Sequence, residues 1–568
     1  MLIRRTSPHL RQQLLTATAL CLTAGITLAL PVGSAETIYF DYGLWGRSLS
    51  TASLETFAAD GTVDAELDSY LAGLSPTSQQ ELQQILNTPL QTLGSDTFAQ
   101  MSDPFVLSQW LYTPMGDTFL ASLGLLIQTQ SGQNGQQALR AAMILAAADP
   151  AGLSLINIIR FYPTDGLRLD LPQILALADS LNTNIAITEQ LVMVATDQSQ
   201  LAAASDPAMD YGALPLLAET GPFEVVQQAL VLEDQQRDRT YPVDIYQPAD
   251  LQAVPGPVPV MVFSHGYGET RTQPDISSLA HSVAANGFVV AVPEHIGSNQ
   301  AYQHDLAQGL VSESFAAMEF INRPLDIRFL LDTLEQKNEA EFQGRLQLEQ
   351  VGLMGYSFGG YTALATAGAT VDLERLHQQC DLDAEFTPDT ANIALLIQCR
   401  LFELAALPNA IPTLTDGSLA DDRVSLVVAF APLSNLFGEQ GMGNIQSPVV
   451  IMGGAYDVAA PIALEQLTAF QWLTTPDKYF YVAENLSHTS ELTRLILALE
   501  HPQSDIVTQF NATESELFSL AISLAIAHGH VYLRRDEAYR PYLTAAYVET
   551  LSRDPTKLHL LRSFPDNF

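Results

Sequence analysis

Residues 351–361 read VGLMGYSFGGY, and this stretch decides the fold. An apolar run of strand length leads into a Gly-x-Ser-x-Gly turn centred on Ser357, and the TALATAGA that follows favours a helix. Serine between glycines is common in structural turns. A strand before the turn and a helix after it instead predict a nucleophile elbow, in which small neighbours let strand and helix approach closely. The serine then lies above the sheet edge, at the positive end of the helix dipole.

Other apolar runs of strand length lie on both sides of this turn. We expect strands at residues 223–232, 240–246, 258–263, 287–292, 351–354, 424–430, 449–452 and 479–482. Stretches with helical character, such as 325–334, separate them. Strands that alternate with helices predict an α/β fold with a mostly parallel eight-stranded sheet covered by helices on both faces, its first two strands forming an antiparallel pair.

A serine nucleophile needs a histidine as its base. In this fold class the chain order is serine, acid, histidine, so the base is expected after Ser357. His488 follows an expected strand by a short loop and is the predicted base. Among the alternatives, His377 lies too early in the chain and His501 is expected in a surface loop. His528 and His530 are expected to pack in a late helix.

The acid that orients this histidine is predicted at Asp457. It ends the sequence GGAYD, which follows the expected strand at 449–452. A carboxylate on the loop beyond the carboxyl end of a strand can reach the Nδ1 side of the histidine. The rival acids are Glu484, two residues past the next strand, and Asp477, at the wrong end of that strand; for both, the alternative is a solvated surface position.

An acyl-transfer site also needs two backbone N–H groups for the developing oxyanion. One is expected from Phe358, the residue after the nucleophile, and the other from the loop SHGYG after the third strand, where we assign the N–H of Tyr267. His265 precedes the nucleophile and is expected to shape this loop by hydrogen bonding. His295, in PEH after the next strand, either lines the pocket or satisfies its own loop.

The chain organisation predicts three segments. Residues 1–35 have a basic start, an apolar run at 14–30 and small residues at 33–35, the pattern of a secretory signal peptide cleaved after Ala35. Residues 36–220 predict an all-α domain and linker, with helical spacing at 54–57 and 65–71 and helices near 76–86 and 138–148. Residues 221–568 predict the catalytic domain, with an insertion at about 370–422 that forms either a lid or a structural side flap.

Net charge, apolar runs and cysteine spacing bear on partners, location and cofactors. The formal net charge is −38, so nucleic-acid binding is not expected. After cleavage no stretch is long and apolar enough to predict a membrane span, and we expect export to the periplasm or the extracellular space. Cys380 and Cys399 lack zinc-ligand spacing and are predicted to form a disulfide, the alternative being two free thiols. No metal or cofactor is expected, and the oligomeric state is left open.

Five motifs occur in order along the chain: FSHGYGETRT at 263–272, PEH at 293–295, GYSFGG at 355–360, GGAYDVAAP at 453–461 and SH at 487–488. Together they resemble the platelet-activating-factor acetylhydrolase and dienelactone-hydrolase-related branch of the α/β hydrolases, over roughly residues 223–500. The resemblance implies an ester hydrolase with Ser357, Asp457 and His488 as its triad and the Tyr267 and Phe358 positions as oxyanion donors. Dienelactone hydrolases use a cysteine nucleophile, whereas this chain has a serine.

Two N-terminal stretches carry a second resemblance. Residues 48–61 and 138–163 are similar to cyanobacterial exported hydrolases in which a helical domain of unknown function precedes the catalytic domain. We therefore expect an exported serine esterase acting on lipid or short acyl esters. The alternatives are a polyester, cutin-like or peptide hydrolase with the same triad, and a non-catalytic binding protein on a hydrolase scaffold.

Overall fold

The computed structural model describes residues 34–42, 45–89, 102–219, 221–381, 391–484, 486–488, 506–554 and 557–565. Residues 1–33 of the expected signal peptide lie outside them, as does His501. The chain divides into two compact units: Met1–Pro89 together with Ile127–Asp170, and Leu90–Leu126 together with Leu171–Phe568. Among the described residues, no helix is both long enough and apolar enough to cross a membrane.

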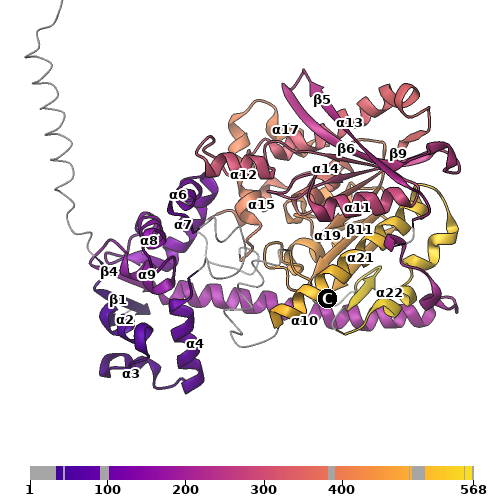
Figure 1. Cartoon of the computed structure of the whole chain (residues 1–568). Helices are drawn as coiled ribbons and strands as arrows, with labels where there is room; N and C mark the ends of the chain where they lie inside the picture. Colours follow the sequence, from indigo (N-terminus) through magenta and orange to yellow (C-terminus); the bar gives the residue numbers. More distant parts are fainter. Residues whose placement is uncertain are drawn as a thin grey trace, which may run out of the picture. The chain divides into compact units, whose positions relative to one another are not determined.

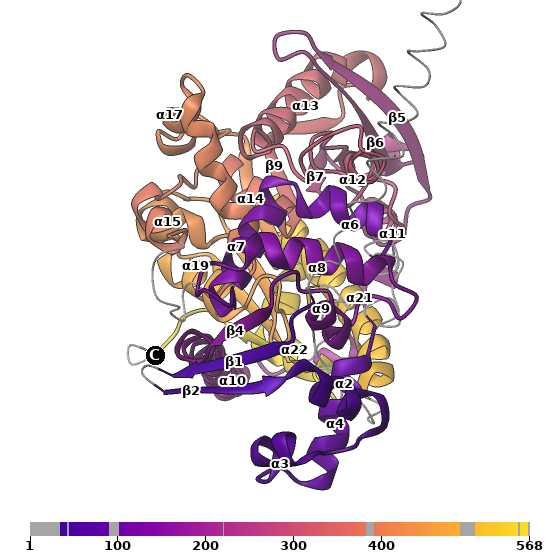
Figure 2. The same ribbon diagram turned by 90° about the vertical axis from the view of Figure 1, so that its left-hand side faces the viewer.

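The first unit contains a small sheet as well as helices. Its strand order is β2-β1-β4-β3, with β1 (Thr37–Tyr42) antiparallel to β2 (Trp45–Ser50) and parallel to β4 (Gly166–Asp170), which pairs antiparallel with β3 (Ile127–Thr129). Figure 2 shows β1, β2 and β4 side by side. The helices are α2 (Thr51–Asp60), α3 (Ala65–Leu71), α4 (Pro76–Asn87), α8 (Gln136–Ala148) and α9 (Leu155–Arg160).

The expectation of an all-α N-terminal domain is therefore wrong in one respect. The predicted helices are present as α2, α3, α4 and α8, but four strands accompany them. These strands have six residues or fewer, too short for an apolar alternation to stand out. The central pair, β1 and β4, also joins segments far apart in the chain, and nothing local in the sequence signals that pairing.

The second unit is built on a nine-stranded sheet of order β13-β12-β11-β10-β9-β7-β8-β6-β5. The six strands from β12 to β8 run parallel, while β13, β6 and β5 are antiparallel to their neighbours. The strands are β5 (Val225–Asp234), β6 (Arg239–Pro248), β7 (Val258–Ser264), β8 (Val289–Pro293), β9 (Leu346–Tyr356), β10 (Val424–Phe430), β11 (Val449–Gly454), β12 (Lys478–Ala483) and β13 (Leu558–Leu561).

All eight expected strands are present, and β13 is an additional one. It has four residues and pairs antiparallel with the edge strand β12, so the sequence offers no period long enough to predict it. Successive side chains of the central strands enter two different apolar clusters: Val262 and Leu353 belong to one, Phe263 and Met354 to the other. The wholly apolar strands are thus explained by burial on both faces.

Helices cover both faces of this sheet (Figure 1). Apolar residues of α13 (Glu319–Glu341) and α14 (Phe358–Thr366) join one cluster, and those of α11 (Pro274–Ala285) and α21 (Ile506–Tyr532) join the other. The remaining helices of this unit are α6 (Pro104–Leu111), α7 (Pro114–Leu126), α10 (Leu171–Ser205), α12 (Gln300–Ala307), α15 (Leu373–Gln379), α16 (Leu395–Gln398), α17 (Ala410–Thr415), α18 (Gly438–Gly443), α19 (Thr468–Trp472) and α22 (Ala545–Leu551).

The expected insertion at 370–422 is attached to the sheet unit at several points. Cys380 and Cys399 form the predicted disulfide. Asn392 and Gln398 donate hydrogen bonds of 2.6 and 2.7 Å to the buried Oε1 of Glu465. The disulfide closes a loop within the insertion, and the hydrogen bonds to Glu465 fix its described part, which lacks residues 382–390, to the sheet unit.

Candidate active site

Ser357 occupies a strained turn between β9 and α14. Its φ is 55° and its ψ is −116°, in a region that residues with a side chain rarely adopt. The turn is held because the backbone N–H of Ser357 donates to the carbonyl of Phe430 at 2.9 Å. The residue is 6% exposed. Strain of this kind persists where the surrounding structure over-determines it.

The glycines around the serine are required by close backbone approach. A Cβ on Gly355 would lie 2.1 Å from the carbonyl oxygen of Gly359. A Cβ on Gly359 would lie 1.9 Å from the carbonyl oxygen of Ser264, at the end of β7. Both distances are far below van der Waals contact, so the GYSFGG sequence lets β9, α14 and the end of β7 meet at one point.

The structure brings Ser357, His488 and Asp457 into one hydrogen-bonded chain. Nε2 of His488 lies 2.7 Å from Oγ of Ser357, and Nδ1 lies 2.8 Å from Oδ2 of Asp457. The ring of Tyr356 stacks on the imidazole with centroids 5.0 Å apart, and its hydroxyl donates to the carbonyl of His488. The imidazole is therefore held from both its ring face and its backbone.

Asp457 is fixed by the loop that follows β11. Its Oδ1 accepts the backbone N–H groups of Ala459 at 3.0 Å and Ala460 at 2.7 Å, which leaves Oδ2 for the histidine. The rival acids lie elsewhere. Glu484 pairs with His559 at 2.8 Å, and Asp477 accepts a hydrogen bond from the hydroxyl of Tyr532 at 2.9 Å.

The electrostatic surroundings favour a proton on His488. Burial acts to lower its pKa, but Asp457, then Glu269 and Glu465, act to raise it, and the net direction is upward. A histidine whose charged form is stabilised by a fixed carboxylate can take a proton from a neighbouring hydroxyl. This is the electrostatic requirement for a base next to a serine.

The two expected oxyanion donors lie at the same edge of the sheet. The register of β7 and β9 sets Ser264 opposite Gly355, which brings the loop of Tyr267 next to the start of α14. Phe358 is the first residue of α14, where an N–H has no partner within the helix. Within the described residues, neither the N–H of Tyr267 nor that of Phe358 donates to another backbone group.

His265 and His295 are both completely buried. Nδ1 of His265 donates to the carbonyl of Gly266 at 2.8 Å, and its Nε2 accepts the backbone N–H of His295 at 3.0 Å. His265 thus shapes the loop as expected. Nε2 of His295 lies 2.9 Å from Oγ of Ser264. His295 therefore makes a hydrogen bond within the protein interior.

The other histidines considered as bases lie away from Ser357. His528 and His530 are buried in α21, where His528 lies 3.0 Å from the hydroxyl of Tyr481 and His530 stacks on Tyr539 with centroids 3.8 Å apart. His377 packs edge-on against Phe402 within the insertion. These contacts indicate that each of the three histidines packs within the fold.

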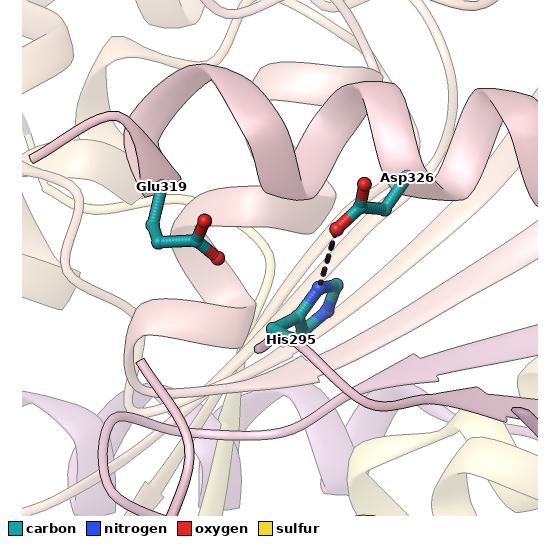
Figure 3. A group of neighbouring side chains, drawn as sticks. All are labelled: His295, Glu319 and Asp326. Carbon is teal, nitrogen blue, oxygen red and sulfur yellow. Dashed lines mark ion pairs between the residues drawn. The ribbon is translucent and has the colours of Figure 1, made fainter. Parts of the chain in front are cut away.

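A buried cluster of His295, Glu319 and Asp326 is the one group among the described residues with metal-ligand chemistry, its ligand atoms lying within 4.8 Å of one another. Figure 3 shows both carboxylates coming from α13, and a carboxylate oxygen of Asp326 lies 3.5 Å from Nδ1 of His295. Arg239 lies 2.9 Å from Glu319 and 2.8 Å from Asp326, and Arg237 lies 2.8 Å from Asp326. Guanidinium groups already balance both carboxylates, so the chemistry fits an ion-pair network better than a cation site.

Sequence reasoning missed the charged residues around the loop at 264–268, which carries the expected donor Tyr267. Arg323 donates to the carbonyls of His265 and Gly266, and Glu269 accepts the N–H of Gly266. Glu269 stands in the quoted motif FSHGYGETRT and could have been singled out there. Arg323 lies in a helix with no motif of its own, and only the packing of α13 against the sheet brings it to the loop.

Comparison with family models gives two matches, both to hydrolases. Residues 34–170 match a family described as alpha/beta hydrolase of unknown function (DUF1400). Residues 238–314 match platelet-activating factor acetylhydrolase, isoform II, a stretch that contains the Tyr267 loop, His265 and His295. A search of curated proteins finds no match. The nine-stranded, mostly parallel sheet of the second unit has the architecture of an α/β hydrolase, and the two matches support a hydrolase of the esterase type.

Proposed function

We propose that this chain is an exported serine carboxylic ester hydrolase that acts on lipid or short acyl esters through an acyl-enzyme. The observation that carries the proposal is the hydrogen-bonded chain from Ser357 through His488 to Asp457, with Ser357 at a φ of 55°. A strained serine, a base at 2.7 Å and a fixed carboxylate are the parts that nucleophilic acyl transfer requires.

In the proposed reaction, Nε2 of His488 takes the proton of Ser357 as Oγ attacks the ester carbonyl carbon. Asp457 keeps the proton of the resting imidazole on Nδ1 and stabilises the imidazolium that forms. The imidazolium then protonates the leaving alcohol as the tetrahedral intermediate collapses to the acyl-enzyme. Water, activated by the same histidine, attacks the acyl group and restores Ser357.

The tetrahedral oxyanion would be bound by the backbone N–H groups of Tyr267 and Phe358. Each such donor contributes about 3 kcal/mol to lowering the barrier. The site is water-poor, because Ser357 and Asp457 are 6% and 5% exposed, and this strengthens each hydrogen bond to the developing charge.

One observation supports the substrate class, and two support the location. The match to platelet-activating factor acetylhydrolase spans the loop that carries the proposed donor, and this favours lipid or acetyl esters. The disulfide of Cys380 and Cys399 is typical of oxidising compartments, and the apolar run at 14–30 follows a basic start as in a signal peptide. Both favour export.

The test is hydrolysis of p-nitrophenyl esters from C2 to C16 by the protein beginning at Glu36, beside Ser357→Ala. We expect activity that the substitution abolishes, and a chain-length profile that separates acetyl from long-acyl chemistry. A fluorophosphonate probe should label the unsubstituted protein at Ser357. A folded protein that neither hydrolyses esters nor reacts with the probe would contradict the proposal and favour a binding protein on a hydrolase scaffold.

A further inference from the structure

Arg323 is a completely buried arginine whose guanidinium contacts the loops after β7 and β8. Nη1 donates to the carbonyl of His265 at 2.6 Å, and Nη2 donates to the carbonyl of Gly266 at 3.3 Å. Nε and Nη2 also donate to Oγ of Ser298 at 2.9 and 2.8 Å. Burial lowers the pKa of Arg323 to about 10 against the opposing effect of Glu319, so the group stays charged at neutral pH.

The bond to the carbonyl of Gly266 fixes the direction of the Tyr267 N–H. The two groups belong to one planar trans peptide unit, in which the N–H points opposite to the C=O. The same carbonyl also accepts a hydrogen bond from Nδ1 of His265 at 2.8 Å. With its oxygen held from the protein interior by two donors, this peptide has one available orientation, and its N–H is directed away from Arg323.

The guanidinium also contacts the residue that carries the second donor. Its central carbon lies 4.4 Å from the ring centroid of Phe358, at cation–π distance. The aromatic rings of Phe315, Phe320 and Tyr361 surround Phe358 at centroid distances of 5.1, 5.1 and 5.3 Å, so the ring has no freedom to move away. One side chain therefore contacts both residues whose N–H groups form the proposed oxyanion site.

Glu269 holds the same loop through a further hydrogen bond. Its Oε2 accepts the N–H of Gly266 at 2.6 Å. Gly266 is thereby bound at its N–H by a carboxylate and at its carbonyl by a guanidinium. Charge-assisted bonds are about twice as strong as neutral ones, so the pair resists rotation of the loop peptides.

We propose that Arg323 and Glu269 are positioning residues that orient the Tyr267 and Phe358 N–H groups as an oxyanion site. This inference rests on the proposed function and deepens it. Neither residue touches the reacting atoms; both act through the loop backbone, and Arg323 acts also through the Phe358 ring. Because an oxyanion is stabilised only in the transition state, losing the orientation should lower kcat and leave KM nearly unchanged.

The experiment compares Arg323→Lys with a matched control, Arg345→Lys. Arg345 also binds backbone carbonyls, those of Leu251, Val254 and Gly256, but it does so at the opposite end of β7. Hydrolysis of p-nitrophenyl acetate and the rate of fluorophosphonate labelling are measured for proteins whose folding is checked by thermal unfolding. We expect Arg323→Lys to lower kcat about 100-fold or more, the loss seen for one oxyanion donor, and to slow labelling similarly. Arg345→Lys should keep kcat within about threefold.

A second pair of variants covers the case in which Arg323→Lys does not fold. Glu269→Ala removes the acceptor for the Gly266 N–H, whereas Glu269→Gln retains an acceptor oxygen. We expect Glu269→Ala to lower kcat at constant KM, and Glu269→Gln to restore most of that loss. A folded Arg323→Lys with unchanged kcat, or equal kcat in both Glu269 variants, overturns the inference while an active parent protein preserves the proposed function. A parent protein inactive toward esters and probe overturns both.

Discussion

The second unit contains two Ser–His–Asp groups on the same sheet. One consists of Ser357, His488 and Asp457, and the other of Ser264, His295 and Asp326. In the first, Oγ lies 2.7 Å from Nε2 and the carboxylate lies 2.8 Å from Nδ1. In the second, Oγ lies 2.9 Å from Nε2, and the carboxylate lies 3.5 Å from Nδ1. Residue types and the serine–histidine distance nearly coincide.

The two groups differ in burial and in the charges around the histidine. All three residues of the second group are completely buried, whereas Ser357 and Asp457 of the first are 6% and 5% exposed and His488 is partly exposed. Burial, with Arg323 and Arg239, holds the pKa of His295 well below its usual range. Asp326 is engaged by Arg239, so it is not free to stabilise an imidazolium. On the proposed function, the two groups therefore differ in access and in having an uncommitted carboxylate, which residue types alone do not supply.

The largest expected difference between the groups is at the serines. Ser357→Ala should lower kcat by about a million-fold, the loss that follows removal of a triad serine. Ser264→Ala should keep kcat within about tenfold and instead lower the free energy of unfolding by about 1–3 kcal/mol, because it removes the hydroxyl partner of a buried imidazole. Ester hydrolysis and urea unfolding of both variants check this. A Ser264→Ala variant that folds but loses activity as Ser357→Ala does would show that the second group takes part in the reaction.

The acids should separate the groups next. Asp457→Asn should lower kcat by about 10,000-fold, because the amide no longer holds the required tautomer of His488. Asp326→Asn should act mainly on stability, by about 3–5 kcal/mol, since it leaves Arg239 without part of its buried counter-charge. The measurements are kcat and the urea midpoint. Equal losses of kcat in the two folded variants would contradict the distinction.

Gly359 lies where the two groups meet, near Ser357 in the chain and against the carbonyl of Ser264. Its position would place a Cβ 1.9 Å from the carbonyl oxygen of Ser264, so Gly359→Ala must displace either the elbow or the end of β7. We expect kcat to fall about 100-fold or more as the Phe358 N–H moves. Gly443→Ala is the matched control, because its Cβ would meet only ordinary contacts, with the nearest atom at 3.6 Å. Similar kinetics for both variants would indicate that the elbow tolerates a displacement of this size.

The smallest expected effect is on pH dependence. In the proposed mechanism the neutral form of His488 is the base, and since the pKa of His488 is raised, the acid limb of kcat/KM should lie above the ordinary histidine value of about 6.5. Glu269→Gln removes one of the charges that raise this pKa and should move the limb to lower pH. His295 should add no limb in this range, because its pKa is far lower. An unmoved limb in Glu269→Gln would contradict the electrostatic role.

The same shift has a consequence for stability with the opposite sign. A histidine whose folded-state pKa is raised contributes stability that is fully present below about pH 6.5 and is lost as the pH rises through the folded-state pKa. The pH rise that generates the active base of His488 therefore removes its ion-pair contribution with Asp457. Deprotonating His488 to form the proposed base therefore lowers the free energy of unfolding.

The sequence predicted the elements around the site because their signals are local. The strand, turn and helix around Ser357 follow from eleven consecutive residues, and the apolar strands follow from burial on both faces. The order of motifs along the chain singled out Asp457 and His488, whose side chains lie 2.8 Å apart in the structure; their catalytic roles stay a prediction. Short strands were harder to predict from the sequence, because they have six residues or fewer and depend on pairing partners; they are β1, β2, β3, β4 and β13.

The amino-acid sequence by itself determined the α/β alternation, the strained serine turn and the chain order of serine, acid and histidine. Each of these is set by short-range sterics and by apolar periodicity, which neighbouring residues encode. Only the tertiary structure decided that Arg323 donates to the backbone of the loop before Tyr267 and that Ser264, His295 and Asp326 form a second, sealed group. Those contacts join α13 to loops of other strands. They depend on sheet register and helix docking, which are properties of the whole packed core.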